Sequence, residues 1–235
     1  MNGKDYRLII FDWDGTLMDS IGRIVSAMRA TATTQQLPVP SVQAVRDIIG
    51  LSLEPAIERL FGRLTSDQHA AFLAQYRDQY VDLDPTPTPL FPGVETMLHN
   101  LREQGYLLAI ATGKARRGLD RVLTETALQD VFHFTRCADE SISKPHPQML
   151  HELMAAAQCS ADETLMIGDS VHDLKMARAA KVDALGVDFG THEALLLQQH
   201  QPLAVLSSWQ QLNDYLPLRA AAVRAGNSLT EREAL

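Results

Sequence analysis

The sequence has few cysteines and no long apolar run. Of its 235 residues only Cys137 and Cys159 are cysteines, and they lack the close spacing of a zinc site. Two cysteines cannot form a disulfide framework, so we interpret both as packing residues in a reducing compartment. No apolar stretch reaches the ~18 residues of a membrane span, and the start MNGKD lacks the apolar core of a signal peptide. We therefore expect a soluble, cytoplasmic chain.

The chain also lacks an excess of positive charge. Its 21 Lys and Arg residues are outnumbered by 29 Asp and Glu, which gives a formal net charge of -8. This balance offers no basic surface for nucleic acid or for an anionic membrane, so we expect neither as a partner. A site that handles phosphate would have to supply positive charge locally, from a lysine, from backbone N–H groups or from a metal ion.

Histidine patterns typical of zinc hydrolases are absent as well. The eight histidines form no HxH or HExxH motif. His172 lies between Asp169 and Asp173, but a hard, oxygen-rich metal site does not call for imidazole. We interpret His172 as a supporting or surface residue.

Short apolar runs alternate with segments long enough for helices. This alternation predicts an α/β fold with a Rossmann-like parallel sheet as its core. Between Gly93 and Gly105, apolar residues at helical spacing predict a helix that leads into one of the strands. The expected strands are 6–12, 107–112, 164–168, 184–187 and 203–206, with a weaker run at 131–138.

The region from residue 20 to residue 83 interrupts this alternation. Ile21, Ile24, Val25 and Met28 lie at helical spacing, and similar stripes follow at 42–49, 56–61 and 72–80. We predict an inserted all-helical cap domain. The proline-rich stretch 84–93 cannot continue a helix and would form an extended connector back to the core.

The predicted domains follow from this interruption. An inserted helical unit on two linkers suits a mobile lid, although a fixed subdomain is the alternative. The boundaries are 1–18 and 88–217 for a discontinuous catalytic core, 19–87 for the helical cap with its linkers, and 218–235 for a C-terminal tail.

Chemically useful side chains follow the predicted strands. Because a parallel sheet brings its carboxyl ends to one edge, these residues could meet in one crevice. Singly, each has a plainer interpretation as a polar turn, a helix cap or a surface lysine. Along the chain they are Asp12 and Asp14, Thr112 and Gly113, Lys144, and Asp169 and Asp173.

Together these residues suit phosphoryl transfer. Clustered carboxylates with oxygen-only surroundings favour Mg²⁺, which also binds the phosphate oxygens of a substrate. Lys144 would supply the local positive charge, while the Thr112 hydroxyl and loop N–H groups could hold phosphate oxygens.

Four motifs resemble those of the haloacid dehalogenase-like superfamily, and most closely its phosphoglycolate phosphatase-like branch. They are DWDGTLMDS at 12–20, Thr112, the pair Lys144-Pro145 and GDSVHD at 168–173. The segment FPGV at 91–94 also matches the way this branch returns to its core after a helical cap. The resemblance spans nearly the whole chain.

The resemblance implies a role for each residue. Asp12 would be the nucleophile that forms an aspartyl-phosphate, and Asp14 the general acid and base. Thr112, Gly113 and Lys144 would bind the phosphoryl group. Mg²⁺ would be held by Asp12, the backbone carbonyl of Asp14 and Asp169, with Asp173 acting through a water or orienting Lys144. The second acid, Asp14, favours phosphate esters over dehalogenation.

Basic residues near these motifs have two interpretations. Arg46, in a cap segment that aligns with the specificity loop of relatives, could touch an anionic part of the substrate, or be an exposed helix arginine. Lys114, Arg116 and Arg117 could line the entrance to the site, but the favoured interpretation is the polar face of the next helix. Gly113-Lys114 lacks the preceding GxxxxG of a nucleotide-binding P-loop.

The leading hypothesis is therefore a Mg²⁺-dependent phosphatase acting on a small-molecule phosphate ester, such as phosphoglycolate or a sugar phosphate. A phosphomutase of the same superfamily is the first alternative. A non-catalytic phospho-acceptor module is the second, although Asp14 would speed the loss of its phosphoryl group. The sequence leaves the identity of the ester and the oligomeric state open.

Overall fold

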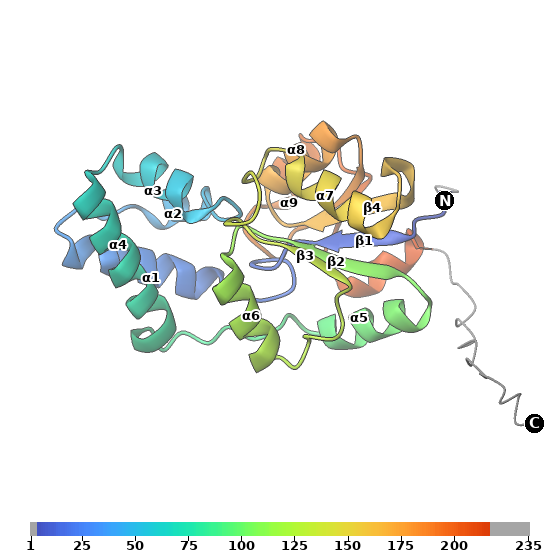
Figure 1. The fold of residues 1–235 in the computed structure, drawn as a ribbon, viewed down its shortest axis with the longest axis horizontal. Helices are drawn as coiled ribbons and strands as arrows, with labels where there is room; N and C mark the ends of the chain where they lie inside the picture. Colours follow the sequence, from blue (N-terminus) through green and yellow to red (C-terminus); the bar gives the residue numbers. More distant parts are fainter. Residues whose placement is uncertain (1–3, 217–235) are drawn as a thin grey trace, which may run out of the picture.

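A six-stranded parallel sheet lies at the centre of the computed structural model, which describes residues 4–216 (Figure 1). Its strand order is β3-β2-β1-β4-β5-β6, with β1 paired in parallel to both β2 and β4. The predicted parallel α/β core is thus confirmed. The strands are β1 (Leu8–Phe11), β2 (Leu107–Ala111), β3 (Phe134–Arg136), β4 (Thr164–Gly168), β5 (Asp183–Val187) and β6 (Ala204–Leu206).

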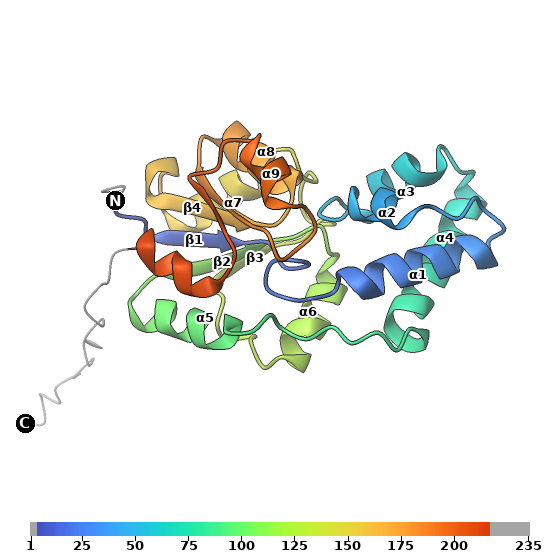
Figure 2. The same cartoon turned by 180° about the vertical axis from the view of Figure 1, so that it is seen from behind.

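Helices cover both faces of the sheet, as Figures 1 and 2 show from opposite sides. On one face, Ile9 and Phe11 pack with side chains of α5 (Val94–Glu103), α6 (Arg116–Glu125) and the 3-10 helix η3 (Trp209–Asp214). Successive side chains of a strand point to opposite faces of the sheet. Because helices cover both faces, every position of β1 needs an apolar residue. This double burial explains why the strands are continuous apolar runs in the sequence.

The second face of the sheet packs against two further helices. Leu8 and Ile10 of β1 lie in a cluster with side chains of α7 (Gln148–Ala157) and α8 (Val171–Ala180). Two further short helices outside the helical insert are the 3-10 helix η2 (Ala161–Glu163) and α9 (Ala194–Gln198). Both cysteines are free and buried, in agreement with their interpretation as packing residues.

The order of the strands creates a crevice next to β1. The chain runs outward from β1 through β2 to β3, and then outward in the opposite direction from β4 to β6. Ligands of open α/β sheets bind beyond the carboxyl ends of the strands, where the strand order reverses. That point lies between β1 and β4, whose ends lead into Asp12 and Asp169.

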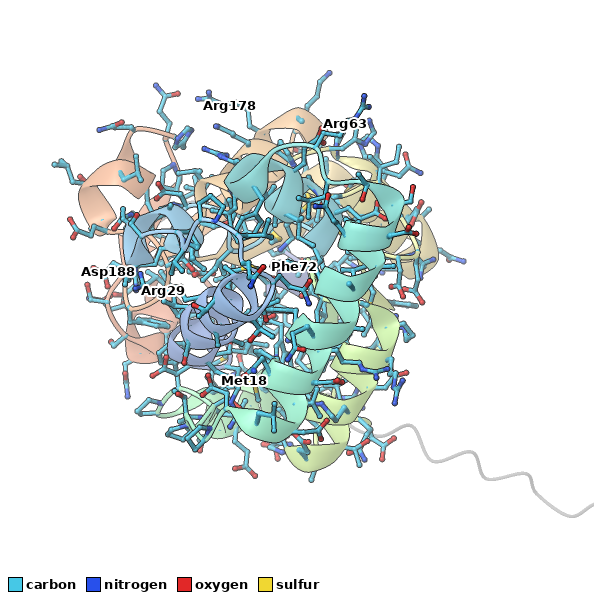
Figure 3. All side chains as sticks on the ribbon, turned by 90° about the vertical axis from the view of Figure 1, so that its left-hand side faces the viewer. Met18, Arg29, Arg63, Phe72, Arg178 and Asp188 are labelled. Atoms are coloured by element: carbon cyan, nitrogen blue, oxygen red, sulfur yellow. The ribbon has the colours of Figure 1, made fainter. Side chains whose placement is uncertain are left out.

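The region from Ile21 to Leu83 is helical, with no strand among its residues. Figure 3 looks onto this side of the molecule, where the helices surround the fully buried ring of Phe72 in a separate apolar cluster. The predicted helices are present, but the one predicted at 42–49 ends early and is followed by turns. The helices are α1 (Ile21–Thr34), α2 (Val42–Arg46), α3 (Leu53–Phe61), α4 (Ser66–Asp78) and the π-helix η1 (Gln79–Leu83).

The proline-rich connector returns the chain to the core without a helix, as its composition predicts. It is fixed at its end, where the Asp19 backbone N–H donates to the Pro89 carbonyl at 2.8 Å and Leu90 forms a bridge with Met18. The domain boundaries at 18, 87 and 217 stay a prediction, and the tail 218–235 lies outside the described residues. Within residues 4–216, no helix is long and apolar enough to cross a membrane.

Candidate active site

Side chains from three strand ends and one loop meet at the carboxyl edge of the sheet. Asp12 follows β1, Thr112 follows β2 and Asp169 follows β4, while Lys144 lies in the loop between β3 and α7. The ammonium of Lys144 is fully buried and lies 2.8 Å from Asp12 Oδ1 and 2.7 Å from Asp173 Oδ1. The structure thus brings together Asp12 and Asp173, which lie near opposite ends of the described chain.

The two carboxylate oxygens of Asp12 have different surroundings. Oδ1 accepts a hydrogen bond from the Trp13 backbone N–H at 2.7 Å and also forms the ion pair with Lys144. Oδ2 is buried and has no hydrogen-bond partner. Burial raises the pKa of Asp12 well above its ordinary value, and the nearby Lys144 opposes this shift. Oδ2 is therefore the oxygen that is available to a ligand.

Asp169 is held rigidly by two donors. The Thr16 hydroxyl donates to Oδ1 at 2.8 Å, and the Thr191 backbone N–H donates to Oδ2 at 2.6 Å. Burial, followed by repulsion from Asp173, raises the pKa of Asp169 from 3.8 to about 6. A buried carboxylate that keeps a raised pKa despite two donors lacks sufficient positive charge nearby.

Asp173 has two structural tasks. It is the third residue of α8, and its Oδ2 accepts from the Ser170 backbone N–H at 3.1 Å, which is part of a capping box. The same oxygen also accepts from the Ser170 hydroxyl at 2.6 Å. Its Oδ1 accepts from Lys144, so it also orients that ammonium. Burial lowers the pKa of Lys144, but the attraction of Asp12 and Asp173 more than offsets this and leaves it above the ordinary value.

Three of these carboxylates form a candidate metal centre. One oxygen from each of Asp12, Asp169 and Asp173 lies within 4.8 Å of the others, and all three residues are buried. A formal charge of −3 thus faces the ammonium of Lys144. A divalent cation would compensate this charge, and a donor set made only of oxygen suits Mg²⁺ or Ca²⁺ better than zinc.

Asp14 lies at the same edge with a different partner set. Its Oδ1 accepts from the Ser20 hydroxyl at 2.6 Å, and its Oδ2 lies 3.0 Å from the ammonium of Lys114. The favoured interpretation of Lys114 as part of the polar face of a helix was wrong. Lys114 precedes α6, its side chain is only 11% exposed, and the ammonium lies 5.1 Å from the ring centroid of Tyr80.

The strand end at Thr112 fixes the position of Lys114. The Thr112 hydroxyl accepts a hydrogen bond from the Lys114 backbone N–H at 3.1 Å, which closes a tight turn. Gly113, within this turn, lies so close to the helical region that an added Cβ would overlap the carbonyl oxygen of Leu51. By contrast, Arg116 begins α6 and pairs with Glu140 at 2.8 Å, as the polar-face interpretation predicts.

Arg46 lies elsewhere than predicted. Its guanidinium donates to the carbonyls of Gly190 at 2.9 Å and Thr191 at 2.7 Å, and it is only half-buried. It is not among the residues that line the cavity beside Asp12. Arg46 therefore ties the end of α2 to the loop that holds Asp169, rather than being a free helix arginine. The predicted contact with substrate has no geometric support here.

Two further contacts join the helical region to the core. The Ser52 backbone N–H donates to the Ser143 hydroxyl at 3.0 Å, and His172 Nε2 lies 3.2 Å from the Asp47 carbonyl. His172 is 5% exposed, so it is a buried supporting residue rather than a surface one. No local pattern predicts these contacts, because they depend on how the helical region packs onto the sheet.

A cavity of about 970 Å³ lies between the helical region and the core. Asp12, Asp14, Thr112 and Gly113 line it on the core side. The helices α1, α3 and α4 supply much of the opposite side, beyond the carboxyl ends of the strands (Figure 1). The candidate nucleophile and the candidate acid therefore line a cavity that is covered by the helical region and still open to solvent at its rim.

Gly15 lies where the loop after β1 approaches the candidate metal centre, so a substitution there tests how close this approach must be. It has a φ of +82°, and an added Cβ would overlap Asp169 Oδ2. If the cluster binds a divalent cation, Gly15→Ala should weaken that binding, measured by calorimetry with Mg²⁺ as the probe. The variant should also lower the free energy of unfolding by more than the roughly 1–2 kcal/mol that a left-handed backbone costs a residue with a Cβ. Gly93→Ala is the matched control, because Gly93 has a left-handed backbone with a φ of +85° and open space around it. Equal Mg²⁺ affinity in both variants would contradict the assignment.

Comparison with protein families gives one broad match. Residues 9–187 match the family described as haloacid dehalogenase-like hydrolase. This range contains every candidate catalytic and metal-binding residue described above. It covers well over half of the chain, and it runs from the second residue of β1 through the helical region to the end of β5.

Individual proteins are similar over nearly their whole length. A Dickeya dadantii protein named probable phosphatase IndB is 34% identical, over 87% of this chain and 91% of its own. A phosphoglycolate phosphatase of Psychrobacter arcticus is 28% identical, over 90% and 96% of the two chains. A solved structure from Bacteroides fragilis, described as a haloacid dehalogenase-like hydrolase, superimposes with a TM-score of 0.81 at 28% identity and covers 88% of this chain and 99% of its own.

Proposed function

Because the chain belongs to the haloacid dehalogenase-like hydrolase family, we propose that it is a Mg²⁺-dependent phosphatase that hydrolyses a small-molecule phosphomonoester through a phosphoryl group on Asp12. Its similarity to curated phosphatases over most of its length places it among the phosphatases of the family. The family and the similar proteins do not establish the metal, the covalent intermediate or the substrate, which we propose from the geometry of the site.

One observation carries the mechanism. Trp13 and Lys144 hold Asp12 Oδ1, while Oδ2 is buried and has no hydrogen-bond partner. Asp12 is also one of the residues that line the cavity. A carboxylate held by one oxygen and open at the other is suited to nucleophilic attack on phosphorus. We assign Oδ2 as the attacking atom.

The residues fit a bound Mg²⁺. The three buried carboxylates, with the raised pKa of Asp169, indicate a local deficit of positive charge that oxygen-seeking Mg²⁺ would compensate. Asp12, Asp169 and the backbone carbonyl of Asp14 would hold the ion, while Asp173 orients Lys144. When bound, the ion would neutralise charge on the transferring phosphoryl group and align it with the nucleophile.

In the first step, Asp12 Oδ2 attacks phosphorus and the bond between phosphorus and the ester oxygen breaks. Asp14 gives a proton to that oxygen, which leaves as an alcohol, and the phosphoryl group remains on Asp12. Lys144 and the Thr112–Gly113 turn would hold the phosphoryl oxygens. Trp13 and Lys144 keep the carboxylate in position through contacts of 2.7 and 2.8 Å.

In the second step, a water attacks the phosphorus of the acyl phosphate. Asp14, now ionised, takes a proton from this water, and the bond between phosphorus and Asp12 breaks to release inorganic phosphate. Ser20 and Lys114 hold the Asp14 carboxylate through contacts of 2.6 and 3.0 Å, so the same group is in place for both steps. The enzyme returns to its starting state.

Removal and return of Mg²⁺ test this function. Protein treated with a chelator should release no phosphate from a panel of phosphate esters, and Mg²⁺ should restore one phosphate and one alcohol per ester consumed.

The pKa of about 6 at Asp169 means that the folded, metal-free protein binds a proton more tightly at this residue than the unfolded chain does. The contribution of Asp169 to the free energy of unfolding of the metal-free protein thus grows as the pH falls through 6. Because Mg²⁺ competes with this proton, the affinity of the protein for Mg²⁺ should drop roughly tenfold per pH unit below that value.

Two aspartates at neighbouring strand ends provide the matched comparison. Asp169→Asn should lose the rise in melting temperature that Mg²⁺ produces. Asp188→Asn should keep it, because Asp188 follows β5 but binds the Ser207 hydroxyl at 2.7 Å, outside the carboxylate cluster. Full activity in the chelated protein would contradict the proposal, and an isomerised phosphate ester without released phosphate would identify a phosphomutase instead.

A further inference from the structure

The cavity beside Asp12 and Asp14 has an apolar far wall. Its volume is about 970 Å³, and the side chains that face the two acids across it come from α1, the loop after α2, α4 and η1. Most of them are buried or half-buried hydrophobic or aromatic residues. They include Ile24, Met28, Ile49, Leu73, Tyr76 and Tyr80.

The size of this cavity exceeds what a very small alcohol would fill. Pockets of roughly 300–1,000 Å³ hold ligands of drug size. If the leaving group carried only two carbons, as in glycolate, most of the space would contain water lying against apolar side chains. Filling the cavity with an apolar body would release that water. The shape of the site therefore favours a substrate with a bulky leaving group.

The charges around the cavity argue against a second anionic group on that body. Lys114 is committed to Asp14 at 3.0 Å. Arg77 and Arg121 each pair with an acid on their own helix, at 3.3 and 2.7 Å. The remaining lining arginine, Arg117, is exposed to solvent. Among the described lining residues, no buried, unpaired cation is left for a carboxylate or a second phosphate.

The ring of Tyr76 adds a preference for a flat body, whereas the ring of Tyr80 already has Lys114 and Arg121 at 5.1 and 5.9 Å from its centroid. The ring centroids of Tyr76 and Tyr80 lie 6.0 Å apart, with an angle of 33° between the ring planes. Both side chains line the cavity. Aromatic groups gain stabilisation from packing against such rings beyond that of buried area alone.

We propose that the substrate is a phosphate monoester whose leaving group carries a bulky, uncharged, apolar or aromatic body that packs against Leu73 and Tyr76. This inference rests on the proposed phosphatase function and names the class of ester on which it acts. The phosphoryl group would lie at Asp12, and the body of the alcohol would occupy the cavity beneath α1 and α4.

Two alkyl esters isolate the contribution of the apolar body. 2-Phenylethyl phosphate and ethyl phosphate have similar alkoxide leaving groups and differ chiefly by the phenyl ring. With the Mg²⁺-loaded enzyme, kcat/KM for the phenylethyl ester should be roughly 10- to 100-fold higher, as expected for burial of one ring. Phosphoglycolate should also be hydrolysed more slowly than the phenylethyl ester. Equal or faster hydrolysis of ethyl phosphate or phosphoglycolate would overturn this inference while the phosphatase function stands.

Matched substitutions locate the effect in the cavity. Leu73→Gln should reduce the preference for the phenylethyl ester to below about a third of its value, because a polar amide replaces part of the apolar wall. Leu195→Gln makes the same chemical change on α9 at a side chain that is 71% exposed, and should leave the preference unchanged. An unchanged preference in a folded Leu73→Gln protein would refute the placement. The comparison of esters with the unaltered enzyme decides the substrate class in any case. Failure to release phosphate from every ester would refute the phosphatase function itself.

Discussion

Replacing Asp12 by asparagine should abolish phosphate release, with a fall in kcat of about 10⁵-fold or to below detection. An amide is not a nucleophile toward phosphorus at neutral pH, although it keeps the shape of the carboxyl group and can still accept from the Trp13 backbone N–H. The measurement is phosphate release from a phosphate ester at saturating Mg²⁺ by the folded variant.

The stability of the same variant separates a chemical effect from unfolding. Burial raises the pKa of Asp12, because removal from water disfavours the charged form of its carboxyl group. Neutral asparagine should therefore leave the melting temperature of the metal-free protein unchanged or higher, since Lys144 keeps its 2.7 Å pair with Asp173. Hydrolysis at more than about a hundredth of the original rate would refute Asp12 as the nucleophile.

The second large effect is expected at Asp14. Asp14→Asn should slow the hydrolysis of an alkyl phosphate by about 10²- to 10⁴-fold, because neither the leaving oxygen nor the attacking water then has a partner for proton transfer. An aryl phosphate such as 4-nitrophenyl phosphate needs little help to leave, so its first step should be much less affected than the release of phosphate. Stopped-flow absorbance and phosphate assays measure the two steps separately.

A double variant controls for the buried cation next to Asp14. The Lys114 side chain is 11% exposed and loses its ion-pair partner in Asp14→Asn, which should lower the free energy of unfolding. Adding Lys114→Met removes the unpaired charge and should restore stability but not activity. Recovery of alkyl phosphate hydrolysis in the double variant would show that Asp14 is not the general acid and base.

The sheet could be predicted because its chemistry is local in the sequence. Strands β1, β2 and β4 are nearly or fully buried along their length and appear as continuous apolar runs. The edge strand β3 has only three residues, all half-buried, and gave the weak signal at 131–138. The order of polar residues after the strands then predicted which side chains would meet, because parallel strands share one carboxyl edge.

Contacts that depend on tertiary packing could not be predicted. Nothing local distinguishes Lys114, which reaches Asp14, from Arg116, which lies on the polar side of α6. Arg46 reaches the carbonyls of Gly190 and Thr191, 144 and 145 residues further along the chain. The composition and volume of the cavity likewise follow from how the helical region lies on the sheet.

The most direct test of the central claim is to trap the phosphoryl group on Asp12. Asp14→Asn protein is mixed with 4-nitrophenyl phosphate and Mg²⁺, quenched in acid, digested and analysed by mass spectrometry. The proposed mechanism predicts a burst of about one nitrophenolate per chain and one phosphoryl group on the peptide that contains Asp12, at that residue. A burst with the phosphoryl group on another residue, or continued turnover with no phosphorylated peptide, would contradict it.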